Sequence, residues 1–333
     1  MKRLLISTVA AGALLGAGSA HAACGDITLA VFSWQSAEAL AFVDQFILKN
    51  GYGCNASTIS GDTVPTITSM AEKGQPDIIS EATPSLLPDI VTKAIADGRI
   101  VSVNPKAIVE GEVSGWYIPQ YLADQHPDIK TVADALRHPE LFPAPENPAK
   151  GGVLQGPQGW GDTVVTAQLF KAMNAADKGF VLVPTGSGAA LDGAIAKAYE
   201  RKQGFIATYW SPTSLLQKYP MLRLEGGMPY DEAEWRRCTT VQSCPDPKPD
   251  YWQAVADETL VSGKLVKRED AAPVLAYLKA RGWSTEAIGK LMLWMTENQA
   301  TGTDAAKHFL KTQPELWTKW VPADVATKIK AAL

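Results

Sequence analysis

The sequence contains few of the residues that build metal sites. It has four histidines, and three of them, His126, His138 and His308, follow the N-terminal 22 residues. None of these three has a histidine, cysteine or carboxylate neighbour at the spacing that metal ligands need. The sequence therefore predicts no metal site.

Motifs for nucleophilic catalysis and phosphate binding are also missing. Gly186-Ser187-Gly188 is not the Gly-x-Ser-x-Gly of a nucleophile turn, and neither a phosphate loop nor a dinucleotide fingerprint occurs. Glu81 could act as a base if burial raised its pKa, but no acid partner or oxyanion site accompanies it. We expect no cofactor and no enzymatic activity. A secreted enzyme that acts through Glu81 is the alternative.

The chain has neither a strong positive charge nor a long apolar run. It has 31 Lys and Arg against 35 Asp and Glu, a formal net charge of −4, so nothing in its balance attracts nucleic acid. The apolar run at residues 4–15 is shorter than the roughly 20 residues that cross a bilayer, and no later segment is long enough. We expect no nucleic-acid partner and no membrane span.

The N-terminal residues are typical of a secretory signal. Met1-Lys2-Arg3 is followed by the apolar run and then by small residues at positions 16–23, which is the three-part pattern of such signals. We expect cleavage after Ala22, so that residues 1–22 form a signal peptide and the protein is periplasmic.

Four cysteines remain after this segment, and an oxidising compartment permits them to pair. In sequence order the pairs are Cys24 with Cys54 and Cys238 with Cys244. A lipid attached to Cys24 is the alternative, but the residues before it lack the leucine of a lipobox. The second pair lies in a proline-rich stretch, residues 228–249, which is expected to be a surface loop.

The order of apolar runs predicts an α/β protein. Its 333 residues suffice for two domains. Residues 27–32, 151–155 and 205–209 are typical of buried strands, and helical patterns follow each of them. From about residue 271 the chain is expected to be helical, and Trp283, Trp294, Trp317 and Trp320 fall there at core positions.

Tryptophan recurs where these predicted strands end or the chain enters a new unit. Trp34, Trp116, Trp160 and Trp210 have this placement, and ligands of open α/β sheets bind at the carboxyl ends of the strands. Indole faces attract cations, including ammonium groups without N–H donors. The sequence therefore predicts a tryptophan cage around a cation. Each of these rings could instead fill a core.

The chain resembles the glycine betaine, proline and choline type of periplasmic substrate-binding protein of ABC importers. The likeness rests on Gly156-Pro-Gln-Gly-Trp-Gly-Asp162, on Tyr209-Trp-Ser-Pro-Thr-Ser-Leu-Leu216, on Gly61-Asp-Thr-Val-Pro-Thr66 and on the Trp-rich helical tail. It implies a two-lobe type II binding-protein fold that closes by hinge motion on a ligand in the interlobe cleft. The expected lobes are residues 23–114 with 223–333, and residues 115–222.

The resemblance also implies roles for single residues. Trp160 and Trp210 match cage tryptophans, and the backbone of Gly161 and Asp162 matches the turn that holds the ligand carboxylate. By the same resemblance, Trp34 and Trp116 occupy positions where relatives in the choline and amine-oxide branches use aromatics.

One segment departs from the family pattern, because Glu81-Ala82-Thr83-Pro84 stands where relatives carry a cage tryptophan. Trp34 and Trp116 would then compensate, Ala82 would enlarge the pocket, or Glu81 would bind a charged amine. Glu81 or Glu112 would supply a counter-charge.

The expected function is capture of a quaternary ammonium or methylated-amine solute, such as glycine betaine, choline, carnitine or an amine oxide. The partners would be this zwitterionic or cationic solute and an ABC permease in the inner membrane, with the protein a monomer. The alternative ligand is an amino acid or another amine that Glu81 recognises.

Overall fold

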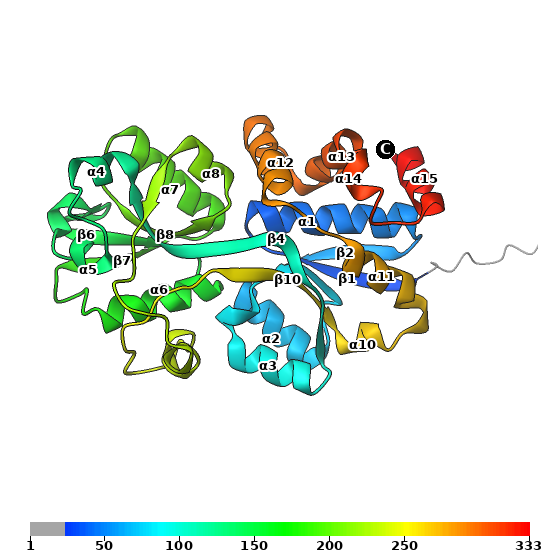
Figure 1. Ribbon diagram of the computed structural model, residues 1–333, viewed down its shortest axis with the longest axis horizontal. Helices are drawn as coiled ribbons and strands as arrows, with labels where there is room; N and C mark the ends of the chain where they lie inside the picture. The colour runs from blue at the N-terminus through cyan, green and yellow to red at the C-terminus, as the bar shows by residue number, and fades with distance from the viewer. Residues whose placement is uncertain (1–23) are drawn as a thin grey trace, which may run out of the picture.

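The computed structural model describes residues 24–333, and one continuous sheet runs through it (Figure 1). The strand order is β2-β1-β3-β10-β4-β8-β6-β5, with β7 paired to β6 and β9 paired to β4. The strands are β1 (Asp26–Val31), β2 (Asn55–Ser60), β3 (Ile78–Ala82), β4 (Ile100–Pro119), β5 (Pro143–Ala144), β6 (Asn147–Gln155), β7 (Phe180–Pro184), β8 (Ile206–Ser211), β9 (Met221–Arg223) and β10 (Val255–Ser262).

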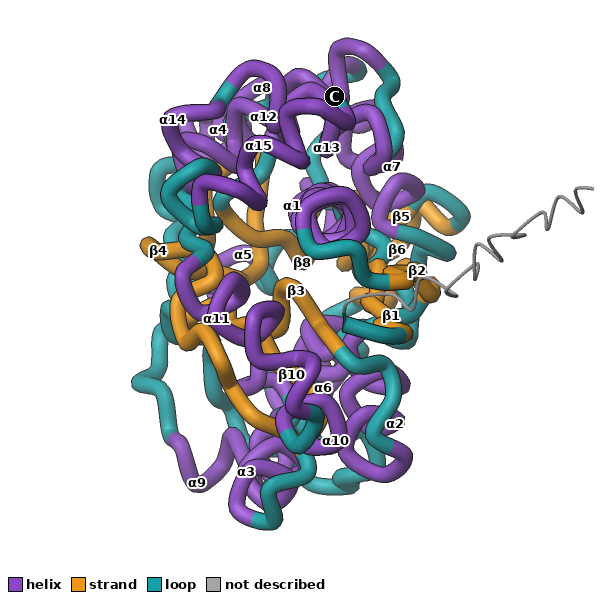
Figure 2. The backbone as a smooth tube through the Cα atoms, turned by 90° about the vertical axis from the view of Figure 1, so that its right-hand side faces the viewer, coloured by secondary structure: helices purple, strands orange, loops and turns teal. Residues whose placement is uncertain are grey.

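Helices cover both faces of this sheet (Figures 1 and 2). The longer ones are α1 (Gln35–Phe46), α2 (Thr63–Lys73), α3 (Pro88–Ala96), α6 (Gly161–Ala172), α7 (Gly188–Glu200), α11 (Ala272–Ala280), α12 (Thr285–Asn298), α13 (Gly302–Thr312) and α15 (Ala323–Ala332). Shorter ones are α4 (Gln120–Gln125), α5 (Val132–Ala135), α8 (Ser214–Lys218), α9 (Glu232–Glu234), α10 (Gly263–Val266) and α14 (Pro314–Trp317), with π- or 3₁₀-turns at 47–51, 84–86, 139–141, 235–239 and 269–271. The predicted α/β class is confirmed.

The 20-residue strand β4 connects two groups of strands. Its residues up to Glu112 pair with β10, which also pairs with β3, whereas Val113 and the residues after it pair with β8 and β9. Figure 1 shows β4 and β10 running side by side between the two halves of the molecule. Gly111 has φ +74 in this segment, and a Cβ there would meet the carbonyl oxygen of Val255 at 2.2 Å, so only glycine fits.

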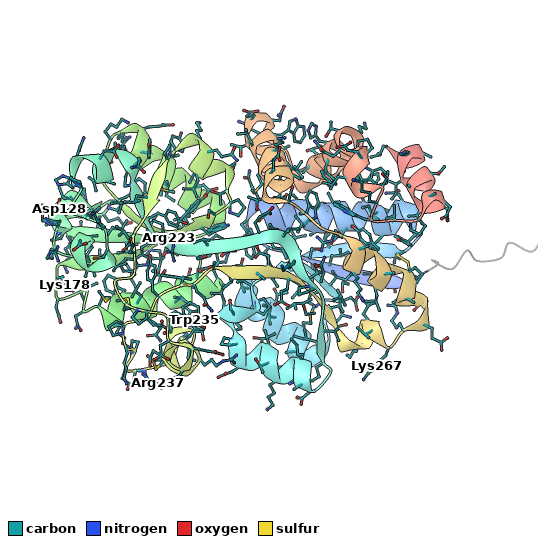
Figure 3. All side chains as sticks on the ribbon, in the orientation of Figure 1. Asp128, Lys178, Arg223, Trp235, Arg237 and Lys267 are labelled. Atoms are coloured by element: carbon teal, nitrogen blue, oxygen red, sulfur yellow. A yellow bond between two sulfur atoms is a disulfide. The ribbon has the colours of Figure 1, made fainter. Side chains whose placement is uncertain are left out.

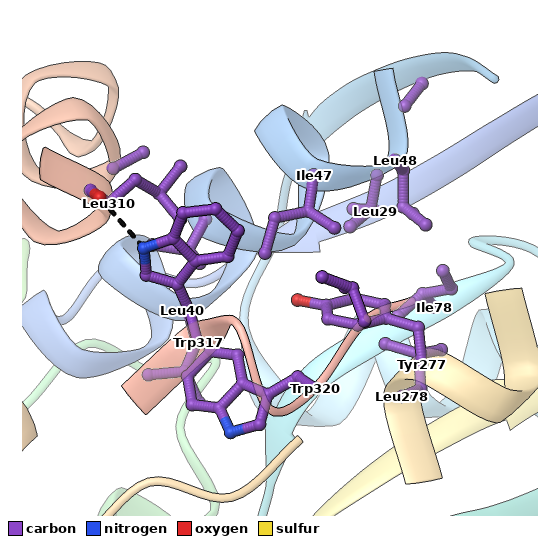
Figure 4. Close-up of a cluster of buried hydrophobic side chains, with 14 of the residues drawn as sticks. Leu29, Leu40, Ile47, Leu48, Ile78, Tyr277, Leu278, Leu310, Trp317 and Trp320 are labelled. Carbon is purple, nitrogen blue, oxygen red and sulfur yellow. Dashed lines mark hydrogen bonds between the residues drawn. The ribbon is translucent and has the colours of Figure 1, made fainter. Parts of the chain in front are cut away.

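The C-terminal helices pack over α1 and the first strands, and large side chains fill the interface (Figure 4). Trp283 and Trp317 are fully buried and Trp320 is 6% exposed, which confirms their predicted core positions. Trp317 Nε1 donates to the carbonyl of Leu310 at 2.8 Å. Trp294 is only half-buried and stacks on His308 with a 3.8 Å separation of ring centroids.

Strand β10 was not expected from the sequence. Its residues, Val-Ala-Asp-Glu-Thr-Leu-Val-Ser, carry two adjacent acidic side chains that obscure the apolar alternation of a strand. Tertiary pairing on both sides, with β3 and β4, nonetheless makes it a central strand. It brings Asp257, at 2% exposure, beside residues more than 140 positions earlier in the chain.

Both predicted disulfides are present. Cys24 pairs with Cys54 and Cys238 with Cys244, with Cα–Cα distances of 4.8 and 5.3 Å. A sulfur held in a disulfide cannot also carry a lipid, so the first pair favours the disulfide over lipidation of Cys24. The predicted signal peptide, residues 1–22, lies outside the described residues. Within residues 24–333, no helix has the length and apolarity that a membrane crossing requires.

Removal of the two disulfides is expected to have unequal effects on stability. The Cys24–Cys54 bond closes a loop five times longer than the Cys238–Cys244 bond, with sequence separations of 30 and 6. Loop-closure entropy then predicts that Cys24→Ser/Cys54→Ser lowers the free energy of unfolding by roughly 1.4 kcal/mol more than Cys238→Ser/Cys244→Ser. Urea denaturation of the two double variants measures this difference. Equal losses would contradict the entropic origin.

Candidate functional site

Segments that follow several strands converge on one small pocket. Trp34 lies between β1 and α1, Trp160 lies directly before α6, and Trp210 is the next-to-last residue of β8. All three line the pocket. The full lining is Trp34, Thr63, Thr83, Leu86, Glu112, Trp160, Asp162 and Trp210.

The three tryptophans form a row in which Trp160 is central. Its ring centroid lies 5.6 Å from that of Trp34 and 5.3 Å from that of Trp210, with interplanar angles of 83° and 81°. Such edge-to-face contacts are favourable for aromatic quadrupoles. Trp160 Nε1 donates to Ser33 Oγ at 3.0 Å and to Asp62 Oδ1 at 3.1 Å. The central ring is therefore held by residues that lie just before α1 and α2.

Glycines before and after Trp160 make room for this arrangement. A Cβ at Gly156 would come within 2.4 Å of the Trp160 ring, and one at Gly161 would come within 2.6 Å of Leu86 Cβ. Real Cβ atoms do not approach neighbours so closely, so each position requires glycine for close packing. The Gly156–Asp162 motif thus positions a ring and the start of α6.

The structure does not bring Trp116 to this pocket. Its side chain is fully buried in a hydrophobic cluster, where Nε1 donates to Thr166 Oγ1 at 3.4 Å. Trp116 lies within β4 rather than beyond its end, so the pleat and the packing of α6 determine where its ring points. Another tryptophan supports the pocket instead: Trp252 Nε1 donates to Asp162 Oδ1 at 2.7 Å.

The segment that lacks a family tryptophan forms a different wall. Ala82 is 1% exposed and packs in the core, whereas Thr83 and Leu86 line the pocket. Glu81 is buried behind them. Its Oε1 accepts hydrogen bonds from Trp34 Nε1 at 2.7 Å and Ser36 Oγ at 2.8 Å, while Oε2 is buried without a hydrogen-bond partner among the described residues.

Four carboxyl groups lie in or next to the pocket. Glu112 and Asp162 line it, whereas Glu81 and Asp257 accept hydrogen bonds from the lining residues Trp34 and Thr83. Burial raises the pKa of Glu81, although hydrogen bonds from Trp34 and Ser36 oppose the rise. Burial also raises the pKa of Asp162, to about 6.

Mutual repulsion adds to burial for the other two carboxyl groups. Glu112 has its pKa raised well above the usual value by burial and then by the charges of Asp257 and Asp162. The pKa of Asp257 is likewise raised well above normal, by burial and by the charge of Glu81. Asp257, Thr63, Thr83 and Leu86 were not predicted. The strand end at Glu81–Ala82 pointed to the neighbourhood of Thr83, but no local pattern marked Asp257.

The start of α6 also reaches the pocket. Gly161 is its first residue, and the Asp162 side chain forms part of the lining. Backbone N–H groups at a helix start favour an anion, but the first turn of α6 already carries the acidic side chain of Asp162. The arrangement is suited to a positively charged group.

The described residues contain one group with the spacing of metal ligands: Cys238, Cys244 and Asp246. Its two cysteines form a disulfide, and a disulfide sulfur is not a thiolate ligand. This group therefore does not fit a metal ion.

Comparison with known proteins decides the family. A family model, OpuAC, the substrate-binding domain of ABC-type glycine betaine transport systems, matches residues 25–312. The chain belongs to the OpuAC family. Proteins of this family are periplasmic or extracellular solute-binding components that work with an ABC permease and are not enzymes. This finding removes the alternative of a secreted enzyme.

Solved structures agree with the OpuAC fold. The glycine betaine/L-proline-binding protein ProX from Borrelia burgdorferi superimposes with a TM-score of 0.68 at 18% identity, covering 91% of this chain and 99% of its own. Lactococcal OpuAC in its closed conformation with glycine betaine gives 0.66 at 20% identity, covering 90% and 100%. A choline-binding protein of an ABC transporter in complex with choline gives 0.70 at 18% identity, covering 93% and 98%.

These likenesses show that the OpuAC domain has the two-lobe architecture of periplasmic binding proteins. At 18 to 20% identity they establish the fold and not the ligand. A comparison with curated protein sequences found no match.

Proposed function

We propose that this OpuAC domain captures a small solute with a positively charged, methylated nitrogen and delivers it to an ABC permease of the inner membrane. Residues 1–22 would be removed as a signal peptide, and the protein would act in the periplasm as a monomer. The observation that carries the proposal is the pocket itself, in which Trp34, Trp160 and Trp210 adjoin Glu112 and Asp162.

The indole rings and the carboxylates would both act on the positively charged group of the solute. The faces of three indoles attract a methylated cation, at about 0.5 to 2 kcal/mol for each contact, depending on desolvation. Carboxylates supply the opposite charge in a low-dielectric pocket, where attraction is stronger than in water. In this proposal Trp116 and Ala82 support the pocket from the core and do not contact the solute, so the cage has three indole walls.

We further propose that the molecule closes by bending at β4 and β10, near Glu112 and Val255. Contacts across the cleft support a closed arrangement: Val64 N donates to the Gly159 carbonyl at 3.0 Å, and Ser214 Oγ donates to Gln35 Oε1 at 2.9 Å. Both contacts join elements of the β1–β3 group to elements of the β6–β8 group. Residues 23–114 with 223–333 would form one lobe and residues 115–222 the other.

A second candidate ligand is an amine that retains N–H donors. The unpartnered Glu81 Oε2 and the carboxyl groups of Glu112 and Asp162 favour this ligand, because ammonium N–H groups would satisfy them. An amino acid fits less well, since its own carboxylate would enter a pocket that already holds acidic groups.

A thermal-shift screen followed by calorimetric titration tests the proposal. Ligands that bind only the folded state raise its melting temperature, so choline or another methylated ammonium compound is expected to do so, with saturable binding at one site per chain. L-proline and L-arginine serve as amino-acid comparisons. If methylated ammonium compounds leave the melting temperature unchanged while an amino acid raises it, the proposed ligand class is wrong.

A further inference from the structure

The pocket collects acidic groups from four different elements. Glu81 comes from β3, Glu112 from β4, Asp162 from α6 and Asp257 from β10. Glu81, Glu112 and Asp257 are 3%, 9% and 2% exposed. Among residues 24–333, no lysine, arginine or histidine belongs to the pocket lining.

The basic side chains nearest to this cluster are engaged elsewhere. Arg281 is fully buried, with Nε 3.2 Å from Asp44 Oδ1 and Nη2 donating to the Ser80 carbonyl at 3.0 Å. Its charge lowers the pKa of Glu81 only as the last of several causes. Asp44 is therefore the carboxylate partner of this guanidinium. Asp44 also accepts a hydrogen bond from Tyr277.

Arg223, labelled in Figure 3, belongs to β9, which pairs with the last residues of β4. It donates to the backbone carbonyls of Ser114 at 2.9 Å and Trp252 at 3.0 Å, and its guanidinium packs over the Tyr251 ring. It forms no ion pair with the four carboxyl groups. Tyr117, which also faces this region, stays neutral because burial raises its pKa.

Four ionised carboxylates cannot remain together in such a site without compensation. Burial of an unpaired charge is expensive, and carboxyl groups respond by taking up protons. Only neutral groups donate to these carboxyl groups. Glu81 accepts from Trp34 and Ser36, whereas Glu112 accepts from Ser114, Asp162 from Trp252 and Asp257 from Thr83. One or two hydrogen bonds of this kind do not neutralise a carboxylate. The empty pocket must therefore hold protons.

We infer that the pocket exchanges protons for its ligand, so that a solute of net positive charge bearing an N–H donor enters as carboxyl protons leave to solvent. This inference rests on the proposed function and specifies its substrate class. The ligand keeps its own N–H proton. Its positive charge balances the carboxylates in place of the carboxyl protons that are released. A zwitterion is disfavoured because its carboxylate would lie against Glu112 or Asp162 and prevent their ionisation.

The direction of the pH dependence follows from the pKa of each group. In the empty pocket the pKa of Asp162 is about 6, and those of Glu112 and Asp257 are well above normal. A bound cation lowers them. At a pH between the pKa of a carboxyl group in the ligand-bound protein and its pKa in the ligand-free protein, binding releases the proton of that group. The affinity then rises with pH, by tenfold per pH unit for each proton released.

The experiment is calorimetric titration of the purified protein at pH 6, 7 and 8. Each titration is repeated in buffers of different ionisation enthalpy, which yields the number of protons released. The probes are N,N-dimethylethanolamine, a cation with one N–H; choline, the matched cation without it; and glycine betaine, a zwitterion. We expect proton release with both cations and an affinity that rises from pH 6 to 8 in proportion to the number of protons released. We also expect the tightest binding for N,N-dimethylethanolamine and the weakest for glycine betaine.

Glu112→Gln is expected to reduce the number of protons released and to flatten the pH dependence. Glu110→Gln is the control, since Glu110 is exposed on the same strand two residues earlier and bonds to Thr285. It should retain the wild-type pH dependence. Equal pH dependence in Glu112→Gln and wild type would overturn the assignment of Glu112.

Infrared spectroscopy of the empty protein tests the protonated cluster without any ligand. A carbonyl band of protonated carboxyl groups at pH 7, diminished in Glu112→Gln, supports the inference. If choline or glycine betaine binds without proton release and the band is absent, proton exchange is wrong while the proposed function stands. If no ammonium compound binds at any pH, the proposed function fails and the inference falls with it.

Discussion

Replacement of Trp210 by alanine should weaken ligand binding more than tenfold and leave the protein folded. The Trp210 ring is only partly buried and lines the pocket, where it contacts Trp160 at 5.3 Å and Tyr209 at 4.7 Å between centroids. Its removal eliminates a cation–π wall and apolar contact area together. Calorimetric titration with the tightest ammonium ligand of the screen gives the change in Kd.

Trp294→Ala is the matched control for this experiment. Trp294 is also partly buried, but it stacks on His308 at the surface of α12 and α13, away from the pocket. It should keep the wild-type affinity. Trp210→Phe should retain part of the binding, because a smaller ring still presents a negative face. An unchanged affinity in Trp210→Ala would remove this residue from the site.

Trp116→Ala should instead lower the free energy of unfolding by about 3 to 5 kcal/mol, the range for loss of a large buried aromatic side chain. The Trp116 ring is fully buried between β4 and α6, and nothing smaller would fill its space. Urea denaturation measures the loss. Because this variant can fail to fold, Trp116→Phe is examined beside it.

Trp116→Phe separates packing from ligand contact. It should reduce stability less than the alanine variant and leave the ligand Kd within about twofold of wild type, since Trp116 does not line the pocket. A tenfold loss of affinity with little change in stability would place Trp116 in the site, in agreement with the family resemblance and against the position of its ring.

The alternation of apolar segments and turn residues made the α/β class and most elements predictable. Predicted strand 27–32 corresponds to β1 and predicted strand 151–155 to the last part of β6. The helical region expected from about residue 271 contains α12, whose Ser284 side chain accepts from Ala287 N as a cap. These features depend on residues close together in the chain. Their physical causes act within one strand or one helical turn.

Side-chain direction was less predictable than element position. Trp34, Trp160 and Trp210 lie at or beyond strand ends, and all three line the pocket. Trp116 lies inside β4. A ring inside a strand points to one face or the other, and packing partners distant in sequence decide which face is core.

The acidic cluster shows the same limit. Glu81, Asp162 and Glu112 were singled out from the sequence, but Asp257 was not, because the strand that carries it forms only by pairing with β3 and β4. Its charge then raises the pKa of Glu112. The electrostatic character of the pocket thus comes from a long-range contact.

Local sequence alone determined the class of the fold and the positions of the tryptophans at strand ends. Tertiary structure alone decided which rings meet, which ring is core and how many carboxyl groups share one pocket. Backbone patterns and turns are set by neighbouring residues, whereas burial and electrostatic repulsion depend on distances in space that the chain order does not specify.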